Sequence, residues 1–111
     1  MYWNMILDQT GKSQWGWKQN SMISIDKASG KVAYNPEYYL MKHLSYFVEP
    51  GSKYVPVSID PNCLAFVKGK NLVVFYYNVS EKASRKTFIA GGKSISVELN
   101  PKSFNTFKIR I

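Results

Sequence analysis

The spacing of hydrophobic and polar residues changes twice along this chain, and the changes separate three regions. Residues 2–7 form a short, largely apolar run, which predicts a buried strand. Residues 22–26 alternate between apolar and polar, and residues 31–34 can pair back on them across a turn at 27–30. The first region is therefore predicted to contain short strands joined by turns.

A helix is predicted in the second region, over about residues 36–48. Asn35 suits the N-cap, Pro36 suits the first helical position, and Glu37 places an acid in the first turn. The apolar residues that follow recur at the i, i+3, i+4, i+7 spacing of one helical face. They are Leu40, Met41, Leu44, Phe47 and Val48. The Glu-Pro-Gly sequence at 49–51 then ends the helix.

The third region, from residue 53 onward, has the pattern of β-strands. Gly69-Lys70 suits a type II′ turn and Gly91-Gly92 suits a type I′ turn. Residues 72–77 are apolar on both faces, as a central strand would be. The predicted strands lie near 54–59, 63–68, 71–78, 85–90, 94–99 and 103–111. Short strands with regular turns indicate a mainly β fold, an antiparallel β-sandwich.

Charge and cysteine content narrow the class of protein. The net charge is +8, but the basic residues are scattered singly, and Arg85-Lys86 is their only adjacent pair. A nucleic-acid partner is not expected without a basic stripe or a known motif. The single cysteine, Cys63, lies in an apolar strand pattern and is predicted to be buried and inert. No apolar run approaches the roughly 20 residues of a membrane-spanning helix, and no signal peptide is recognisable. The chain starts inside a predicted strand, as a fragment would.

Catalytic and metal-binding motifs are not recognisable. His43 is the only histidine and is distant in sequence from the cysteine, so neither a metal site nor a cofactor is predicted. The seven acids lie mostly in turns or beside helix ends, and no catalytic pair stands out. They are Asp8, Asp26, Glu37, Glu49, Asp60, Glu81 and Glu98. The sequence Asn78-Val79-Ser80 fits the glycosylation pattern, but such triplets are common by chance.

Tryptophans and amides gather near the N-terminus. Flat indole rings can stack on the C–H faces of a sugar, while amides pair with its hydroxyls. The residues concerned are Trp3, Trp15, Trp17, Asn4, Gln19 and Asn20. Composition alone favours the simpler interpretation, in which the rings pack in the core or at strand edges.

Three segments of the chain carry a resemblance to a known family. They are YWNMILDQTGKSQWGWKQNSMISID, YNPEYYLMKHLSYFVEPGSKYV and VELNPKSFNTFKIRI. Together they contain the patterns W-N-x-x-L-D, N-P-E-Y-Y and H-x-S-x-F-V-x-P-G-S. Over essentially its whole length the chain resembles the C-terminal part of family 30 glycoside hydrolases, which include glucosylceramidases, β-1,6-glucanases and xylanases.

The resemblance implies a (β/α)₈ barrel with an attached β-sandwich. Residues 1–50 would be the last strand, loop and helix of the barrel, and residues 51–111 the C-terminal sandwich. The loop at 9–34 would then lie at the rim of the sugar cleft, since barrel active sites lie on such loops. Trp3 and Asn20 match positions that resemble the family's substrate-pocket residues. Trp15 and Trp17 are weaker candidates, because this loop varies within the family.

The resemblance also implies that the catalytic residues lie in another part of a larger parent protein. The family hydrolyses glycosides with retention, using two glutamates on the fourth and seventh barrel strands. Neither glutamate lies in this chain, which is therefore expected to be inactive alone. The expected substrate of the parent is a β-linked glucoside or glucan, and xylan is less favoured. We also expect packing against the missing barrel and N-terminal strands, and a secreted or periplasmic location.

Two alternatives remain open at this stage. The chain could be a stand-alone carbohydrate-binding β-sandwich, which would bind a β-glucan through the tryptophans. It could instead be a basic interaction domain for polyanions, whose binding would depend steeply on salt.

Overall fold

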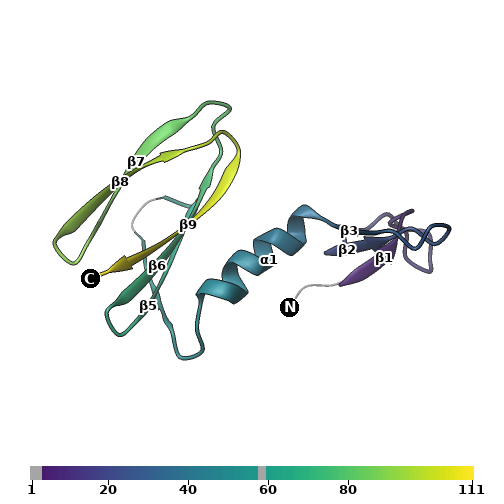
Figure 1. The fold of residues 1–111 in the computed structure, drawn as a ribbon, viewed down its shortest axis with the longest axis horizontal. Helices are drawn as coiled ribbons and strands as arrows, with labels where there is room; N and C mark the ends of the chain where they lie inside the picture. Colours follow the sequence, from purple (N-terminus) through teal and green to yellow (C-terminus); the bar gives the residue numbers. More distant parts are fainter. Residues whose placement is uncertain (1–3, 58–59) are drawn as a thin grey trace. The chain divides into compact units, whose positions relative to one another are not determined.

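The computed structural model describes residues 4–57 and 60–111 (Figure 1). The chain divides into two compact units, Met1–Ser45 and Tyr46–Ile111, and the division falls in the last turn of its helix. Each unit is described by itself below.

The first unit contains a small sheet of three strands. They are β1 (Ile6–Asp8), β2 (Ile23–Ile25) and β3 (Val32–Tyr34). β1 pairs with β2 in parallel, and β2 pairs with β3 in an antiparallel hairpin. The hairpin predicted from residues 22–26 and 31–34 is confirmed.

The predicted strand at 2–7 is only partly confirmed. Residues 2 and 3 lie outside the described residues, and Asn4 and Met5 are not in a strand. Asn4 has a φ of +54°, which interrupts an extended chain and which asparagine tolerates better than most residues. The strand therefore begins late, at Ile6, and runs on to Asp8.

The helix α1 (Pro36–Phe47) forms where the cap and the apolar spacing predict it. Asn35 directly precedes the helix, and its side chain joins the start of the helix to β2 and the residues just before β2. Its Nδ2 donates to the carbonyl oxygen of Ser21 at 2.8 Å and to Oγ of Ser24 at 2.9 Å. None of the α1 side chains is buried by the described part of the chain. The apolar face predicted from the periodicity is thus only partly covered, since Leu40 and Met41 are exposed while Leu44 and Phe47 are half-buried.

The second unit contains six strands in two sheets. One sheet has the order β4-β5-β6-β9, and the other is the β7-β8 hairpin; all neighbouring strands are antiparallel. The strands are β4 (Lys53–Val55), β5 (Cys63–Lys68), β6 (Asn71–Asn78), β7 (Ser84–Ala90), β8 (Lys93–Leu99) and β9 (Ser103–Arg110). Five of the six match the predicted ranges to within one residue at each end.

β4 is shorter than predicted. The prediction covered residues 54–59, of which 58 and 59 lie outside the described residues. The strand ends at Val55, and the next residue is Pro56. Proline has no N–H to donate to a neighbouring strand, so pairing ends there.

The core of the second unit lies between its two sheets. Leu72, Val74 and Tyr76 of the central strand β6 belong to one apolar cluster, against which Phe88, Ala90 and Val97 of the β7-β8 hairpin pack. In Figure 1 this hairpin lies across from β6. The rings of Tyr76 and Phe88 approach edge to face, with centroids 5.7 Å apart. Leu99 is the most deeply buried large side chain among the described residues. This two-layer packing confirms the mainly β, antiparallel fold class.

Both faces of β6 are buried, as its double-sided apolar pattern predicts. Val73 and Phe75 lie on the face opposite the core, where the rings of Phe75 and Phe66 meet at 6.1 Å. Cys63 is buried beside this strand, and burial raises the pKa of its thiol. The prediction of an inert cysteine agrees with that environment, because the reactive species is the thiolate.

The glycine turns also agree with the predicted turn types. Gly69 has a φ of +57°, as the first central residue of a type II′ turn requires. Gly91 and Gly92 have φ values of +55° and +72°, the pair of positive angles that defines a type I′ turn.

Asn78, at the end of β6, joins three segments of the second unit. It is only 4% exposed, and its Nδ2 donates to the carbonyl oxygens of Asn100 at 2.7 Å and Lys82 at 3.3 Å. Its Oδ1 accepts the N–H of Ser80 at 3.2 Å. A side-chain nitrogen held in this way is not presented for glycosylation, so the Asn-Val-Ser triplet acts as a structural joint.

We expect Asn78→Ala to lower the free energy of unfolding by about 1–3 kcal/mol, because it removes the hydrogen bonds that the buried Asn78 amide makes to Lys82, Asn100 and Ser80. Urea unfolding followed by circular dichroism measures the loss. Val79→Ala is the matched control at a half-exposed neighbour, and its effect should stay within about 0.5 kcal/mol. Equal effects of the two substitutions would contradict the role given to Asn78.

Candidate functional site

The loop between β1 and β2 folds back on itself as a small hairpin at residues 12–18, here called the tryptophan hairpin. Lys12 and Lys18 face each other across its base in an antiparallel bridge. Inside the bridge, the N–H of Ser13 donates to the carbonyl of Trp17, and the N–H of Gly16 donates to that of Ser13, both at 2.9 Å. Gly16 has a φ of +81°, a conformation that favours glycine.

The two indoles of this hairpin are exposed to solvent. Trp15 is 68% exposed and Trp17 is 66% exposed, and their ring centroids are 5.9 Å apart at an interplanar angle of 35°. Oγ of Ser13 accepts the backbone N–H of both residues at 3.3 Å. Core packing, which composition alone favoured, does not account for this pair.

A polar pocket of about 460 Å³ lies beside the hairpin, within the first unit. Asn20 lines it, as do other residues of the loop, of β2 and of the start of α1. Its lining residues are Asp8, Gln9, Thr10, Gly11, Lys18, Gln19, Asn20, Ser21, Ser24, Asn35, Pro36 and Glu37. The amides and hydroxyls among them can both donate and accept hydrogen bonds, as the hydroxyls of a sugar require.

The predicted site residues fall in different places. Asn20 lines the pocket, whereas Trp15 and Trp17 do not occur among its described lining residues. Trp3 lies outside the described residues. Next to it in the chain, Asn4 donates from Nδ2 to Oε1 of Gln19 at 2.6 Å, which joins the start of β1 to the pocket wall.

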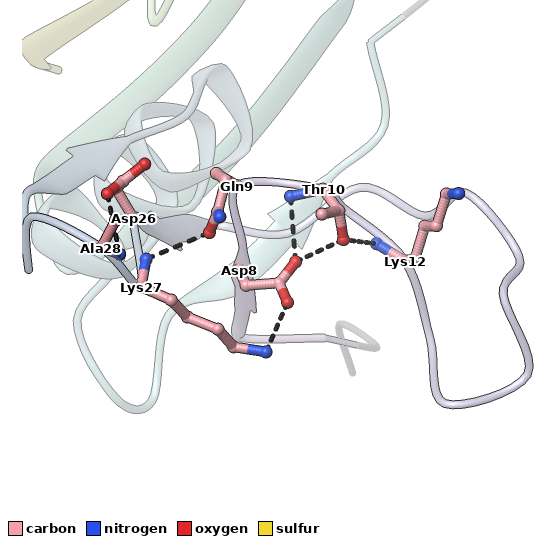
Figure 2. Close-up of polar contacts among 7 residues, drawn as sticks. All are labelled: Asp8, Gln9, Thr10, Lys12, Asp26, Lys27 and Ala28. Carbon is pink, nitrogen blue, oxygen red and sulfur yellow. Dashed lines mark hydrogen bonds and ion pairs between the residues drawn. The ribbon is translucent and has the colours of Figure 1, made fainter.

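Asp8 anchors the base of the loop (Figure 2). Its Oδ2 forms an ion pair with Nζ of Lys27 at 2.6 Å, and its Oδ1 accepts both the N–H and the hydroxyl of Thr10, at 2.9 and 2.5 Å. Oγ1 of Thr10 accepts the N–H of Lys12 at 3.3 Å, and Oε1 of Gln9 accepts the N–H of Lys27 at 3.1 Å. These contacts run from the end of β1 to the base of the tryptophan hairpin.

This anchor was not singled out from the sequence. The hydrogen bond from Lys27 contributes most to lowering the pKa of Asp8 to about 2, followed by the bonds from Thr10. The local part of the anchor has a sequence pattern, an Asp followed two residues later by Thr at a turn. The contact with Lys27 has no local sequence pattern, because Lys27 lies in the turn between β2 and β3.

The described residues do not contain a group of three His, Cys, Asp or Glu side chains that could hold a metal ion. Within that same part of the chain, the helix is too short and too polar to cross a membrane. Two carboxylates line the pocket, those of Asp8 and Glu37. Asp8 is already engaged by Lys27, and we assign a catalytic role to neither.

Comparison with curated proteins gives a relative in the glucosylceramidase group, although no family model matches the chain. A Caenorhabditis elegans protein named "Putative glucosylceramidase 3" is 27% identical over 112 residues. The alignment covers 94% of this chain but only 22% of that protein. The chain therefore spans about a fifth of the length of this relative.

Two solved structures share the fold. The crystal structure of SrfJ from Salmonella typhimurium matches with a TM-score of 0.85 and 24% identity, over 98% of this chain. The endo-β1,6-glucanase BT3312 matches with a TM-score of 0.76 and 23% identity, over 96% of this chain. In each case the match takes up 26% of the larger protein, in its C-terminal part.

These matches define the class of fold, that of the C-terminal region of glycoside hydrolases. Within that class, the chain is similar to glucosylceramidase-like and β-1,6-glucanase proteins. The resemblance read from the sequence motifs is thus confirmed.

The anchor at Asp8 predicts a specific dependence of stability on pH. Because the pKa of Asp8 is lower in the folded chain than its ordinary value of 3.8, its contribution to stability is fully present above pH 3.8. The contribution is lost as the pH falls from there toward about 2. We expect Asp8→Asn to destabilise the first unit at pH 7 and to remove this part of the pH dependence.

Urea unfolding at a series of pH values, followed by tryptophan fluorescence, measures this dependence. Glu81→Gln is the matched control, because it removes an exposed carboxylate paired with Lys102 in the second unit. If Asp8→Asn and the unaltered chain lost stability in parallel below pH 3.8, the anchor would not have the role described.

Proposed function

We propose that this chain is the C-terminal portion of a retaining β-glycosidase of the family 30 type, related to glucosylceramidases and β-1,6-glucanases. The observation that carries the proposal is a match over nearly the whole chain to proteins of which the match takes up only 22% or 26%. On this proposal, residues 1–50 are the last strand, loop and helix of a (β/α)₈ barrel. Residues 51–111 are the C-terminal β-sandwich.

The pocket in the first unit supplies part of the proposed sugar cleft. Asn20 contributes an amide that can pair with sugar hydroxyls, and the hydrogen bond between Asn4 and Gln19 holds the adjoining wall. Trp3, which matches a substrate-pocket position by the family resemblance, would stack on the sugar. Trp15 and Trp17 extend the proposed contact surface beyond the pocket.

The exposed apolar side chains of α1 support a role in a larger protein. Tyr39, Leu40 and Met41 of α1 are all exposed in the described chain. An amphipathic helix is stabilised mainly by burying its apolar face against other elements. We propose that the remaining barrel covers this face, and that the parent protein is secreted or periplasmic and acts on a β-linked glucoside or glucan.

The proposal predicts that the chain alone does not hydrolyse glycosides, because the nucleophile and the acid/base are glutamates of preceding barrel strands. Assays of the 111-residue chain with an aryl β-glucoside and with a β-1,6-glucan should show no turnover. Turnover abolished by Glu→Gln at position 37, 49, 81 or 98 would overturn the proposal. An in-frame barrel with two such glutamates, encoded before Met1, would support it.

A second experiment tests Asn20 in the gene product that contains both glutamates. Asn20→Ala removes a donor and an acceptor from the pocket, and we expect kcat/KM for the β-glucoside to fall by roughly tenfold to a hundredfold. Gln14→Ala is the matched control, since Gln14 is an exposed amide on the same loop that is not among the described lining residues. An equal loss in both variants would show that Asn20 has no specific role.

The stand-alone carbohydrate-binding module is the competing proposal, and the exposed indole pair is the observation that favours it. It requires the isolated chain to bind a soluble β-glucan and to lose that binding on Trp17→Ala. Binding of that kind, together with no barrel before Met1, would replace the glycosidase proposal.

A further inference from the structure

The tryptophan hairpin has two apolar rings that lie outside the core and are not among the described lining residues of the pocket. Each indole leaves about two thirds of its surface in water, and the two rings lie side by side at the tip of one short turn. Adjacent exposed apolar side chains of this size are typical of an interaction surface. Tryptophan in particular is enriched where a protein meets the lipid headgroups of a membrane, because its ring is apolar and its N–H is polar.

The base of the same hairpin holds two like charges opposite each other. Lys12 and Lys18 are cross-strand partners, and both are exposed. Like charges directly opposite on paired strands destabilise the pairing. No acidic residue occurs between Gln9 and Ile25. Asp8 lines a pocket with each of the two lysines but is already paired with Lys27, and Glu37 shares the polar pocket with Lys18. Natural proteins keep locally destabilising pairs mainly where function requires them. An anionic partner would attract both ammonium groups and so offset the repulsion between the two lysines.

Hydrogen bonds within the chain order the tryptophan hairpin in the absence of a partner. Ser13 bonds to the backbone of both tryptophans, and the anchor at Asp8 reaches the backbone of Lys12 through Thr10. A preformed contact surface loses little conformational entropy on binding.

We propose that the tryptophan hairpin docks on an anionic lipid surface. The indoles of Trp15 and Trp17 lie among the headgroups, and the ammonium groups of Lys12 and Lys18 pair with lipid phosphates. A neutral glucan would leave the two lysines unexplained. A nucleic-acid strand needs a basic groove that follows several phosphates, and this hairpin offers two cations at one point.

The proposal goes beyond the glycosidase function and does not depend on it, because docking involves no sugar. If both proposals hold, the parent enzyme meets glucosides that are carried on lipids, with the pocket of the first unit beside the docked hairpin.

Co-sedimentation of the 111-residue chain with vesicles tests the docking. We expect binding to vesicles of equal parts phosphatidylcholine and phosphatidylglycerol, and much weaker binding to phosphatidylcholine alone. Lys12→Gln and Lys18→Gln should each lower the partition coefficient by about fivefold. The double variant Trp15→Ala/Trp17→Ala should lower it by about tenfold or more.

Two matched controls lie on α1 rather than on the hairpin. Tyr46→Ala removes an equally exposed aromatic ring, and Lys42→Gln removes an exposed cation. Both should leave vesicle binding unchanged. Quenching of tryptophan fluorescence by brominated acyl chains gives a second measurement on a Trp3→Phe chain, whose remaining indoles are those of the hairpin. It does not depend on whether the hairpin variants fold.

Three results would overturn the docking proposal. The first is failure to sediment with anionic vesicles. The second is binding that the hairpin substitutions do not reduce, or an absence of quenching by brominated lipid. The third is displacement from vesicles by a soluble β-1,6-glucan or by single-stranded DNA at matched ionic strength, which would assign the hairpin to that ligand instead. Failure of docking leaves the glycosidase proposal untouched, because the activity and Asn20 experiments decide that proposal. Displacement by the glucan would support only the sugar-contact role proposed for Trp15 and Trp17.

Discussion

The parallel pairing of β1 with β2 is the constraint on which the first unit depends. Two parallel neighbours cannot be joined by a tight turn, so the chain must return along the length of the pair before the second strand begins. Here the return is made by loop rather than by helix. That loop contains the tryptophan hairpin, lines most of the pocket and leads to Asn20. The pocket forms beside this loop because the loop must run back along the sheet before β2 begins.

The side chains of a long polar loop keep their positions only if contacts with other segments hold the loop in place. Three such contacts are visible. Asp8 fixes the beginning of the loop against Lys27, Asn4 fixes Gln19 in its second half, and Asn35 fixes its end at Ser21. Each contact joins residues at least 14 positions apart. Because these are hydrogen bonds and an ion pair rather than apolar contacts, the pocket stays polar and retains groups that can meet a sugar.

The second unit is organised differently, around burial. β6 has neighbours on both edges and apolar side chains on both faces, so the sheet and the β7-β8 hairpin assemble around one strand. Asn78 closes the end of that strand with hydrogen bonds to two other segments. This unit is a packed β-sandwich, and the described lining residues of the polar pocket all lie in the first unit instead. The exposed apolar side chains of α1 and of the tryptophan hairpin are the surfaces for which we propose binding partners.

The sequence by itself determined the elements whose signals are local. The Asn-Pro-Glu start and the apolar spacing located α1, and the glycine turns located the strands on either side of them, because caps and turns depend on a few adjacent residues. It also carried the family resemblance, since the motifs are contiguous. Three features were decided only by the tertiary structure: the parallel partner of β1, the ion pair between Asp8 and Lys27, and the exposure of Trp15 and Trp17. Each depends on which distant segments the folded chain brings together or leaves apart, and neither hydrophobic spacing nor composition contains that information.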